Sequence, residues 1–385
     1  MKIQIISLLL FGVHPLTQAE TLKWNVRAQY GMTAGGIGQA VKDAKSHFNK
    51  SPNDVIMLEF DKGTFSLEDN SDSMGTIDLS GVKPGPEGRL VFQGKGMDET
   101  VLVFGDNKHA IFGRDVYRVT FADMHMTRKN YTVSQGLVIE TSPGKVMLEI
   151  QRGFPTPAMI FNPQSDQGRY LRRYTNSRND PHLIEADNHQ IPWVRARHLR
   201  GRLWEIEFKR KSHVANYPKG ALIGIKSKHG GQTYWLSKGS DFIFNSVKWT
   251  QKTRGVFRGG FQKVQILHCV TDRSPPINGQ TPCLAAPGGG PQIGQPNDPT
   301  SSGHLVNQCR FIASGDDAVA FFNSTGIIRG CYIRDAFCRG ILVANGPATV
   351  LEKNTLIRCP VQNSKDHRFH EKAVWLNNND KSRGK

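Results

Sequence analysis

The sequence lacks the marks of several common protein classes. After its first twenty residues it has no apolar run close to the roughly 18 residues that a transmembrane helix needs. It has no CxxC pair, the usual spacing of a structural zinc site, and no phosphate-cradling loop, zinc-protease helix or nucleophile elbow. We therefore expect no membrane span, no bound metal and no other cofactor.

The single long apolar run lies at the N-terminus and has the pattern of an export signal. Lys2 precedes the run at residues 3–13, and the small residues at 17–19 follow it as a cleavage site would. We expect residues 1–19 to be a signal peptide and the protein to be secreted or periplasmic. A membrane anchor is the alternative interpretation.

Acidic residues are few for a chain of this size. The sequence has 33 Asp and Glu residues against 50 Lys and Arg residues, a formal net charge of +17. An exported protein rarely meets nucleic acid, so this field would attract an anionic glycan or an anionic cell surface. The alternative is a surface that charge merely keeps soluble. We expect a polysaccharide or oligosaccharide partner, anionic or neutral, and no nucleic acid.

Helical periodicity is limited to residues 33–48. Thr33 is the expected N-cap, and the apolar residues of one face are Ile37, Ala40, Val41, Ala44 and Phe48. Short strand-like pieces separated by Gly, Pro and Asp turns follow at residues 55–60, 64–67, 76–79 and 89–92. The chain is predicted to be all-β with one amphipathic helix near its start.

A repeat of 22 or 23 residues predicts how the strands are arranged. The spacing is 22 residues from Val247 to Cys269 and from Cys309 to Cys331, and 23 residues from Cys331 to Asn354. A second strand keeps step at residues 255–257, 318–321, 340–343 and 373–376. One rung of a parallel β-helix takes about this many residues, and stacked rungs align like side chains into ladders. The repeat predicts a right-handed parallel β-helix, or solenoid, with an N-terminal capping helix.

Three of the six cysteines, Cys269, Cys309 and Cys331, fall on one such ladder. We favour buried small apolar groups over a disulfide, because stacked neighbours bond only with the right side-chain geometry. The even number of cysteines does not decide between the two.

Two segments interrupt the repeat. Residues 152–220 are rich in Arg, Pro, Asn and Trp, and the alternation at 202–208 indicates an inserted β-rich basic subdomain. Residues 273–303 are predicted to be a long loop, and loops of this length are usually functional or mobile. The predicted organisation is a signal peptide at 1–19, N-terminal rungs with the capping helix at 20–151, the insertion at 152–220, and C-terminal rungs with the site at 221–385.

The sharpest candidate for chemistry is the acid pair Asp316 and Asp317, at a turn that enters a strand. Adjacent strand residues point to opposite faces, but at a turn two carboxylates can converge. Glycoside hydrolysis uses two carboxyl groups, and crowding raises the pKa of one of them, which suits a proton donor. The alternatives are an Asx turn, in which one Asp binds backbone, and a calcium site.

Ladder positions add candidate substrate-binding residues. Arg339 stands one rung after Asp317, and Arg254 two visible rungs before it. These arginines would hold substrate oxygens or an anionic substituent, or form structural ion pairs with the acids. Trp375 would stack on a sugar face or pack in the core. Weaker candidates on the same rungs are Arg258, Asp272, Arg273, Gln292, Arg334 and Asp335.

The layout resembles the pectin-lyase-like β-helix superfamily, through the capping helix and the pieces at residues 60–65 and 93–96. Within it, residues 217–360 resemble glycoside hydrolase family 110, the inverting α-galactosidases; the matching pieces are residues 219–226, 287–293, 315–318 and 339–343. The resemblance implies that Asp316 and Asp317 are that family's acidic pair. A further Asp of the family falls near Gly288 or Gly289, where this sequence has glycine.

Three hypotheses for function result. The first is an inverting glycoside hydrolase on an anionic or galactose-containing polysaccharide, with Asp316 and Asp317 catalytic and Arg254 and Arg339 positioning the sugar. The second is a polysaccharide lyase or epimerase on uronate polymers, which the net positive charge favours. The third is a glycan-binding β-helix protein without turnover, which the missing loop Asp favours.

Overall fold

The computed structural model describes residues 19–380 apart from 68–72, 107, 161–168, 185–190, 228–230, 252–253, 345–348 and 360–372. The predicted signal peptide, except for its last residue, lies outside the described residues. Across the described ranges, no helix is long and apolar enough to cross a membrane.

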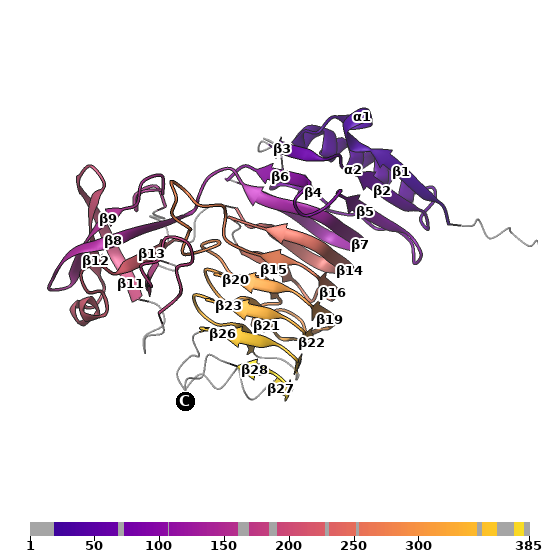
Figure 1. The fold of residues 1–385 in the computed structure, drawn as a ribbon. Coiled ribbons are helices and arrows are strands. Elements are labelled where there is room, and N and C mark those ends of the chain that lie inside the picture. The colour runs from indigo at the N-terminus through magenta and orange to yellow at the C-terminus, as the bar shows by residue number, and fades with distance from the viewer. Residues whose placement is uncertain are drawn as a thin grey trace, which may run out of the picture.

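Most strands coil into one parallel β-helix with three faces (Figure 1). One face consists of β1 (Thr21–Asn25), β2 (Val55–Glu59), β5 (Arg89–Gln93), β16 (Gln262–Leu267), β19 (Ser301–Asn307), β22 (Ser324–Arg329), β25 (Thr349–Glu352) and β27 (Ala373–Leu376). The second consists of β3 (Gly63–Leu67), β6 (Thr100–Phe104), β17 (Val270–Thr271), β20 (Arg310–Ile312), β23 (Tyr332–Arg334), β26 (Thr355–Ile357) and β28 (Asn379–Asp380). The third consists of β4 (Gly75–Asp78), β15 (Gly255–Arg258), β18 (Pro291–Ile293), β21 (Val319–Phe322) and β24 (Ile341–Ala344). Two long strands, β7 (His109–Arg128) and β14 (Tyr234–Trp249), run through all three faces.

The register between rungs confirms the predicted repeat. The residues that follow the ladder positions pair as Lys248 with Val270, Val270 with Arg310, Arg310 with Tyr332 and Tyr332 with Thr355. The residue before a ladder position turns the chain with a positive φ, which is 53° at His268 and 53° at Lys353. At this corner, the rungs therefore repeat a residue whose backbone is in the left-handed region. The shared corner aligns the strands that follow it.

The cysteine ladder has the predicted character. All six cysteines are buried and none forms a disulfide. The thiol of Cys309 donates to the carbonyl of Ile266 at 3.3 Å, inside the coil. Asn354 continues the ladder, because its side-chain oxygen accepts the main-chain N–H of Cys331 at 3.0 Å.

The predicted helix is α2 (Ala34–Phe48), which closes the N-terminal end of the coil (Figure 1). The Thr33 hydroxyl caps it by accepting the N–H of Gly36 at 3.1 Å. All five apolar residues predicted for its inner face are buried. A short helix that the sequence did not indicate, α1 (Val26–Tyr30), precedes it.

The insertion is a closed antiparallel barrel beside the coil (Figure 1). Its strands are β8 (Val133–Ser142), β9 (Lys145–Ile150), β10 (Tyr170–Tyr174), β11 (Ile191–Arg200), β12 (Leu203–Phe208) and β13 (Leu222–Lys226), with the 3-10 helix η1 (Lys211–Asn216) before β13. The strands that flank it, β7 and β14, pair directly with each other. The predicted boundaries, 152 and 220, were therefore too narrow at both ends, because β8 and β9 alternate as rung strands would.

The segment predicted as a long loop, residues 273–303, instead contributes a rung strand. Strand β18 pairs with β15 on one side and β21 on the other. Residues 282–294 are buried throughout. Cys283 packs in one apolar cluster with Tyr174 and Leu222 of the insertion and with Phe337 of the coil. This part of the segment is therefore a packed layer between barrel and coil rather than a mobile loop.

Strand β27 lies on a different face from the predicted one. It pairs with β25, which places Trp375 opposite Leu351, and it does not follow β24. The sequence distance from residue 340 to residue 373 exceeds one rung, so extending the repeat across it was wrong. Trp375 is therefore not on the ladder of the acid pair.

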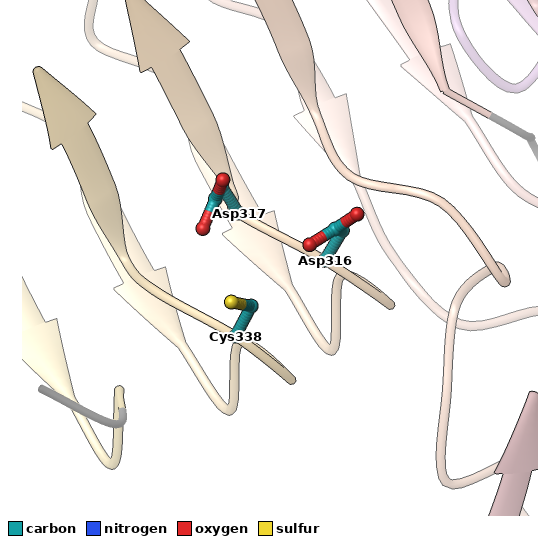
Figure 2. Close-up of side chains that lie close together, drawn as sticks. All are labelled: Asp316, Asp317 and Cys338. Atoms are coloured by element: carbon teal, nitrogen blue, oxygen red, sulfur yellow. The ribbon is translucent and has the colours of Figure 1, made fainter. Parts of the chain in front are cut away.

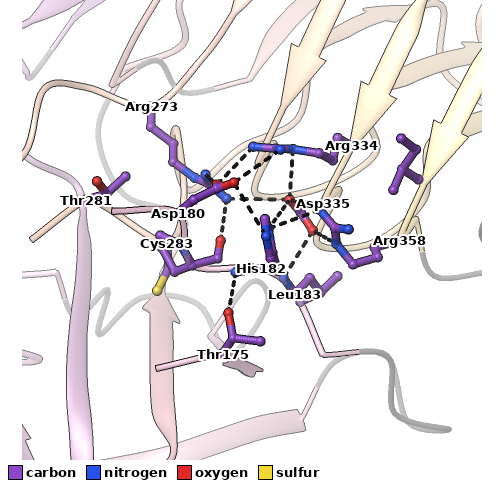
Figure 3. A network of polar contacts seen from close by, with 12 residues as sticks. Thr175, Asp180, His182, Leu183, Arg273, Thr281, Cys283, Arg334, Asp335 and Arg358 are labelled. Atoms are coloured by element: carbon purple, nitrogen blue, oxygen red, sulfur yellow. Dashed lines mark hydrogen bonds and ion pairs between the residues drawn. The ribbon is translucent and has the colours of Figure 1, made fainter. Parts of the chain in front are cut away.

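An ion-pair network fastens the insertion to the coil (Figure 3). The carboxylate of Asp335 is fully buried and lies 2.7 Å from Arg358, 3.2 Å from Arg334 and 3.6 Å from Arg273. Arg273 and Arg334 also bind Asp180 of the insertion, at 3.0 Å and 3.1 Å. Two arginines predicted to bind substrate thus bridge two parts of the protein.

Replacing Asp335 by Asn should weaken this attachment strongly. The shape of the side chain is kept, but three arginines lose a buried charge, and breaking a buried ion pair usually costs about 3–5 kcal/mol. We expect a decrease of this order in the free energy of unfolding in urea. Glu99→Gln is the control, because it removes an exposed pair with Lys62 that should contribute less than about 1 kcal/mol. Similar losses in both variants would contradict the role of the network.

Candidate active site

The acid pair lies on a corner that main-chain hydrogen bonds hold between two neighbouring rungs. The N–H of Gly290 donates to the carbonyl of Asp317 at 2.9 Å, from the preceding rung. The N–H of Ala318 donates to the carbonyl of Arg339 at 2.8 Å, in the following rung. Because both neighbours bind its main chain, the corner has a fixed position directly before β21.

Close packing on the preceding corner explains why glycine stands where the resemblance implies an aspartate. A Cβ atom at Gly289 would lie 2.3 Å from the carbonyl oxygen of Asp317, and one at Gly290 would lie 1.7 Å from that of Ala318. A side chain at either position would push the acid corner away. Position 289, one of the two positions that the resemblance implies, therefore cannot carry a carboxylate without a different main-chain path.

Three side chains converge at the corner: Asp316, Asp317 and Cys338 (Figure 2). One carboxylate oxygen of each Asp and the thiol sulfur all lie within 4.8 Å of one another. Nη1 of Arg339 donates to both carboxylate oxygens of Asp317, at 3.0 Å and 3.2 Å. The Asp317 side chain is 12% exposed and that of Arg339 is 16% exposed. Asp317 thus binds a neighbouring arginine at a partly open position.

The surroundings make Asp317 a weak acid. Burial, and after it the neighbouring Asp316 carboxylate, raise the pKa of Asp317 from 3.8 to about 6, against the opposing effect of Arg339. Burial and the same two carboxylates also hold the pKa of the Cys338 thiol well above its usual value. Below about pH 6, the acid pair therefore carries a proton that is readily given up.

Arg254 lies near the pair, although one position away from the predicted ladder. The pairings of β15 with β18 and of β18 with β21 place it opposite Ala318 rather than Asp317. Burial lowers the pKa of its guanidinium, Asp316 raises that pKa, and Arg258 lowers it. The charges of Asp316 and Arg258 therefore both act on the Arg254 guanidinium.

Lys226, which the sequence reasoning missed, reaches the acid corner from the barrel. Its side chain is fully buried, and its ammonium group donates to the carbonyl of Gly315. The ammonium nitrogen lies 4.2 Å from the ring centre of Phe337 and 5.4 Å from that of Tyr170. The one signal in the sequence is a lysine that ends an apolar strand. Through it, the insertion fixes the main chain next to Asp316.

The other predicted site residues have other partners. Arg273 and Arg334 hold the barrel, as described above, and Asp272 accepts the main-chain N–H of Arg273 at 2.7 Å. Gln292 is 8% exposed and donates to the carbonyl of Gly294 at 3.3 Å. None of these contacts brings the four side chains to the acid pair.

The chemistry of the converging groups suits proton transfer better than a calcium site. Calcium takes about six to eight oxygen ligands, whereas one of the three groups here is the Cys338 thiol. In addition, Arg339 already binds the carboxylate of Asp317, which lowers its capacity to bind a cation.

No protein-family model and no curated protein matches this chain. Among solved structures, it is similar to the catalytic domain of Agl-KA, with 9% identity and a TM-score of 0.43, over 94% of this chain and 54% of that one. It is also similar to the catalytic unit of a GH87 α-1,3-glucanase from Streptomyces thermodiastaticus strain HF3-3, with 11% identity and a TM-score of 0.41, over 88% of this chain and 43% of that one. The chain thus spans about half the length of these two structures. A third similar structure is the A-module of the mannuronan C-5 epimerase AlgE6 from Azotobacter vinelandii, with 10% identity and a TM-score of 0.31, over 91% and 73% of the two chains. At these identities and TM-scores the likeness indicates no activity for this chain.

Carboxyl NMR should show Asp317 titrating with a midpoint at about pH 6. Asp316→Asn should lower that midpoint, because it removes the neighbouring charge, and Arg339→Met should raise it. The raised pKa also has a consequence for stability: the folded state holds the proton more tightly than the unfolded chain. The contribution of Asp317 to stability is therefore full below about pH 4 and is lost as pH rises through about 6. A midpoint near 4 in the unmodified protein would contradict this account.

Proposed function

We propose that this protein is a carbohydrate-active enzyme, a glycoside hydrolase whose acid–base chemistry is carried by Asp316 and Asp317. The observation that supports this most is the raised pKa of Asp317 beside a second carboxylate at a partly open corner. Below about pH 6, where Asp317 holds its proton, such a pair offers a proton donor beside a second carboxyl group, and glycoside hydrolysis uses two carboxyl groups in this way.

In this proposal the two acids have different roles. Asp317 donates its proton to the oxygen of the leaving sugar, and Arg339, at 3.0 Å, stabilises the carboxylate that forms. Asp316, which attracts Arg254, acts as the second carboxyl group and assists the attack at the sugar carbon. After cleavage, a water molecule returns a proton to Asp317 and supplies the hydroxyl group to the sugar.

The separation of the carboxyls bears on the stereochemistry. The nearest ligand oxygens of the pair lie within 4.8 Å, whereas the acid and base of an inverting enzyme are about 6.5–9.5 Å apart to admit a water molecule. Inversion therefore stays a prediction, and it would need a third group opposite the pair. The anomeric form of the first product, followed by NMR, distinguishes inversion from retention.

A lyase or epimerase on uronate polymers is the second candidate, and the arginines beside the acids favour it. Above about pH 6, Asp317 is a carboxylate that can take the proton next to the sugar carboxyl group. Arg254 would neutralise the substrate charge. A rise in ultraviolet absorbance from unsaturated chain ends would identify lysis.

We further propose that the protein acts outside the cytoplasm, on the basis of the signal predicted at residues 1–19. An exported enzyme of this charge would meet extracellular polysaccharides. Mass spectrometry of the mature N-terminus from the native host tests this directly.

Asp316→Asn and Asp317→Asn should each reduce the release of reducing sugar by about 10²–10⁴-fold, because proton transfer by a placed acid or base contributes about that much. A screen over neutral, uronic and sulfated glycans comes first, to find the substrate. The rate of the unmodified protein should fall as pH rises through about 6, where Asp317 loses its proton.

The matched control for these two variants is Asp98→Asn, whose side chain is 82% exposed and which should keep full activity. The thermal midpoint of both site variants should stay within a few degrees of the original. Full activity in Asp316→Asn and in Asp317→Asn would end the hydrolytic proposal.

A further inference from the structure

We propose that Arg254 and Arg258 form an anion-binding subsite next to the acid pair, which takes a carboxylate or sulfate group of an acidic polysaccharide. The proposal rests on the proposed function, because it names the substrate class for the same site.

The two arginines lie on the outer surface of the coil. In β15, Phe257 belongs to the core, and a Cβ atom at Gly255 would lie 2.2 Å from the Tyr234 ring, so both positions face inward. Because strand residues alternate, Arg254, Val256 and Arg258 face outward. Both guanidinium side chains are half-buried rather than extended into solvent.

These arginines differ from most others in the protein in having no direct partner. Within the described part of the chain, neither guanidinium has a carboxylate within 4.0 Å or a hydrogen bond. By contrast, arginines elsewhere have carboxylate partners, as in Arg195 with Glu207, Arg197 with Glu205, Arg202 with Glu149, and Arg358 with Asp335. A half-buried cation without a partner is costly, and a bound anion would offset that cost.

The charges around the pair favour an anion over a neutral ligand. Arg254 and Arg258 repel each other, while Asp316 attracts Arg254 from more than 4.0 Å away. An anionic group between the two guanidinium groups would bind both.

The neighbouring rung supplies a surface for a sugar ring. Trp235 pairs with Val256, directly beside the two arginines. Its ring is half-buried and stacks on Phe112, with ring centres 5.3 Å apart and planes 10° apart. Aromatic rings bind the apolar faces of sugars while their edges stay in contact with water. An arginine pair beside such a ring matches a sugar that carries an acidic group.

The subsite is close enough to the acid pair for one glycan chain to reach both. β15 and β21 are separated by one strand, β18. At about 4.8 Å per strand, this is roughly 10 Å along the coil. The acidic group recognised here would therefore belong to a sugar other than the one that donates the leaving oxygen.

Calorimetry with matched polymers tests the subsite without requiring turnover. The carboxylate arm compares polygalacturonate with its carboxyl-reduced, neutral form. The sulfate arm compares dextran sulfate with dextran. We expect the unmodified protein to bind the acidic member of one pair at least about tenfold more tightly, since hydrogen bonds to charged groups contribute about 1.5–3 kcal/mol. A preference in the carboxylate arm identifies a carboxylate as the bound group, and a preference in the sulfate arm identifies a sulfate.

The decisive variant is Arg254→Met/Arg258→Met, which should lose the preference. Arg195→Met/Arg197→Met is the control, because it removes the same charge from the exposed barrel surface and should keep the preference. If the first double variant does not fold, Arg258→Met alone is measured and should lose most of it. No preference in either arm, or an equal loss in both double variants, would overturn the subsite.

The outcomes for the subsite and for the hydrolase are separable. A preference for the acidic polymer without cleavage supports the subsite and counts against the hydrolase. Cleavage of a neutral polymer by a protein that shows no preference supports the hydrolase and overturns the subsite.

Discussion

Hydrogen bonds between the main chains of successive rungs set the positions of the side chains at the site. Parallel pairing sets each residue opposite a defined residue of the next rung, and a slip of one position would turn every side chain to the other face. Arg339 reaches Asp317 because the two lie opposite each other in neighbouring rungs. The corner itself is bound on both sides, by Gly290 and by Arg339. The geometry of the acid pair is therefore a property of the stack and not of the corner alone.

The inserted barrel contributes to the site in a way that its position in the sequence conceals. It is attached through the network around Asp335 and, separately, through Lys226 to the carbonyl before Asp316. Its apolar residues pack with Phe337, between the two attachments. The barrel thus contacts the coil directly beside the acid corner. Burial is the largest cause of the raised pKa of Asp317.

The sequence predicted those features that repeat. The coil and the cysteine ladder followed from a spacing that recurs from rung to rung. The cap on α2 followed from the residue type of Thr33. The barrel boundaries did not follow, because the alternation of β8 and β9 is the same in a hairpin as in a rung. Strand β18 was missed because its rung holds a long extra segment and so breaks the period. Lys226 could not be placed at all, since only the fold brings β13 to the acid corner.

The balance of charges at the corner explains why an acid surrounded by cations still holds a proton. The Lys226 ammonium donates to a main-chain carbonyl and lies near two aromatic rings, and Asp316 raises the pKa of Arg254. Nη1 of Arg339 binds both carboxylate oxygens of Asp317 and lowers the pKa of that carboxyl, whereas burial and the neighbouring Asp316 raise it. Asp317 can therefore serve as a donor below about pH 6, and its arginine is in place to stabilise the carboxylate that forms.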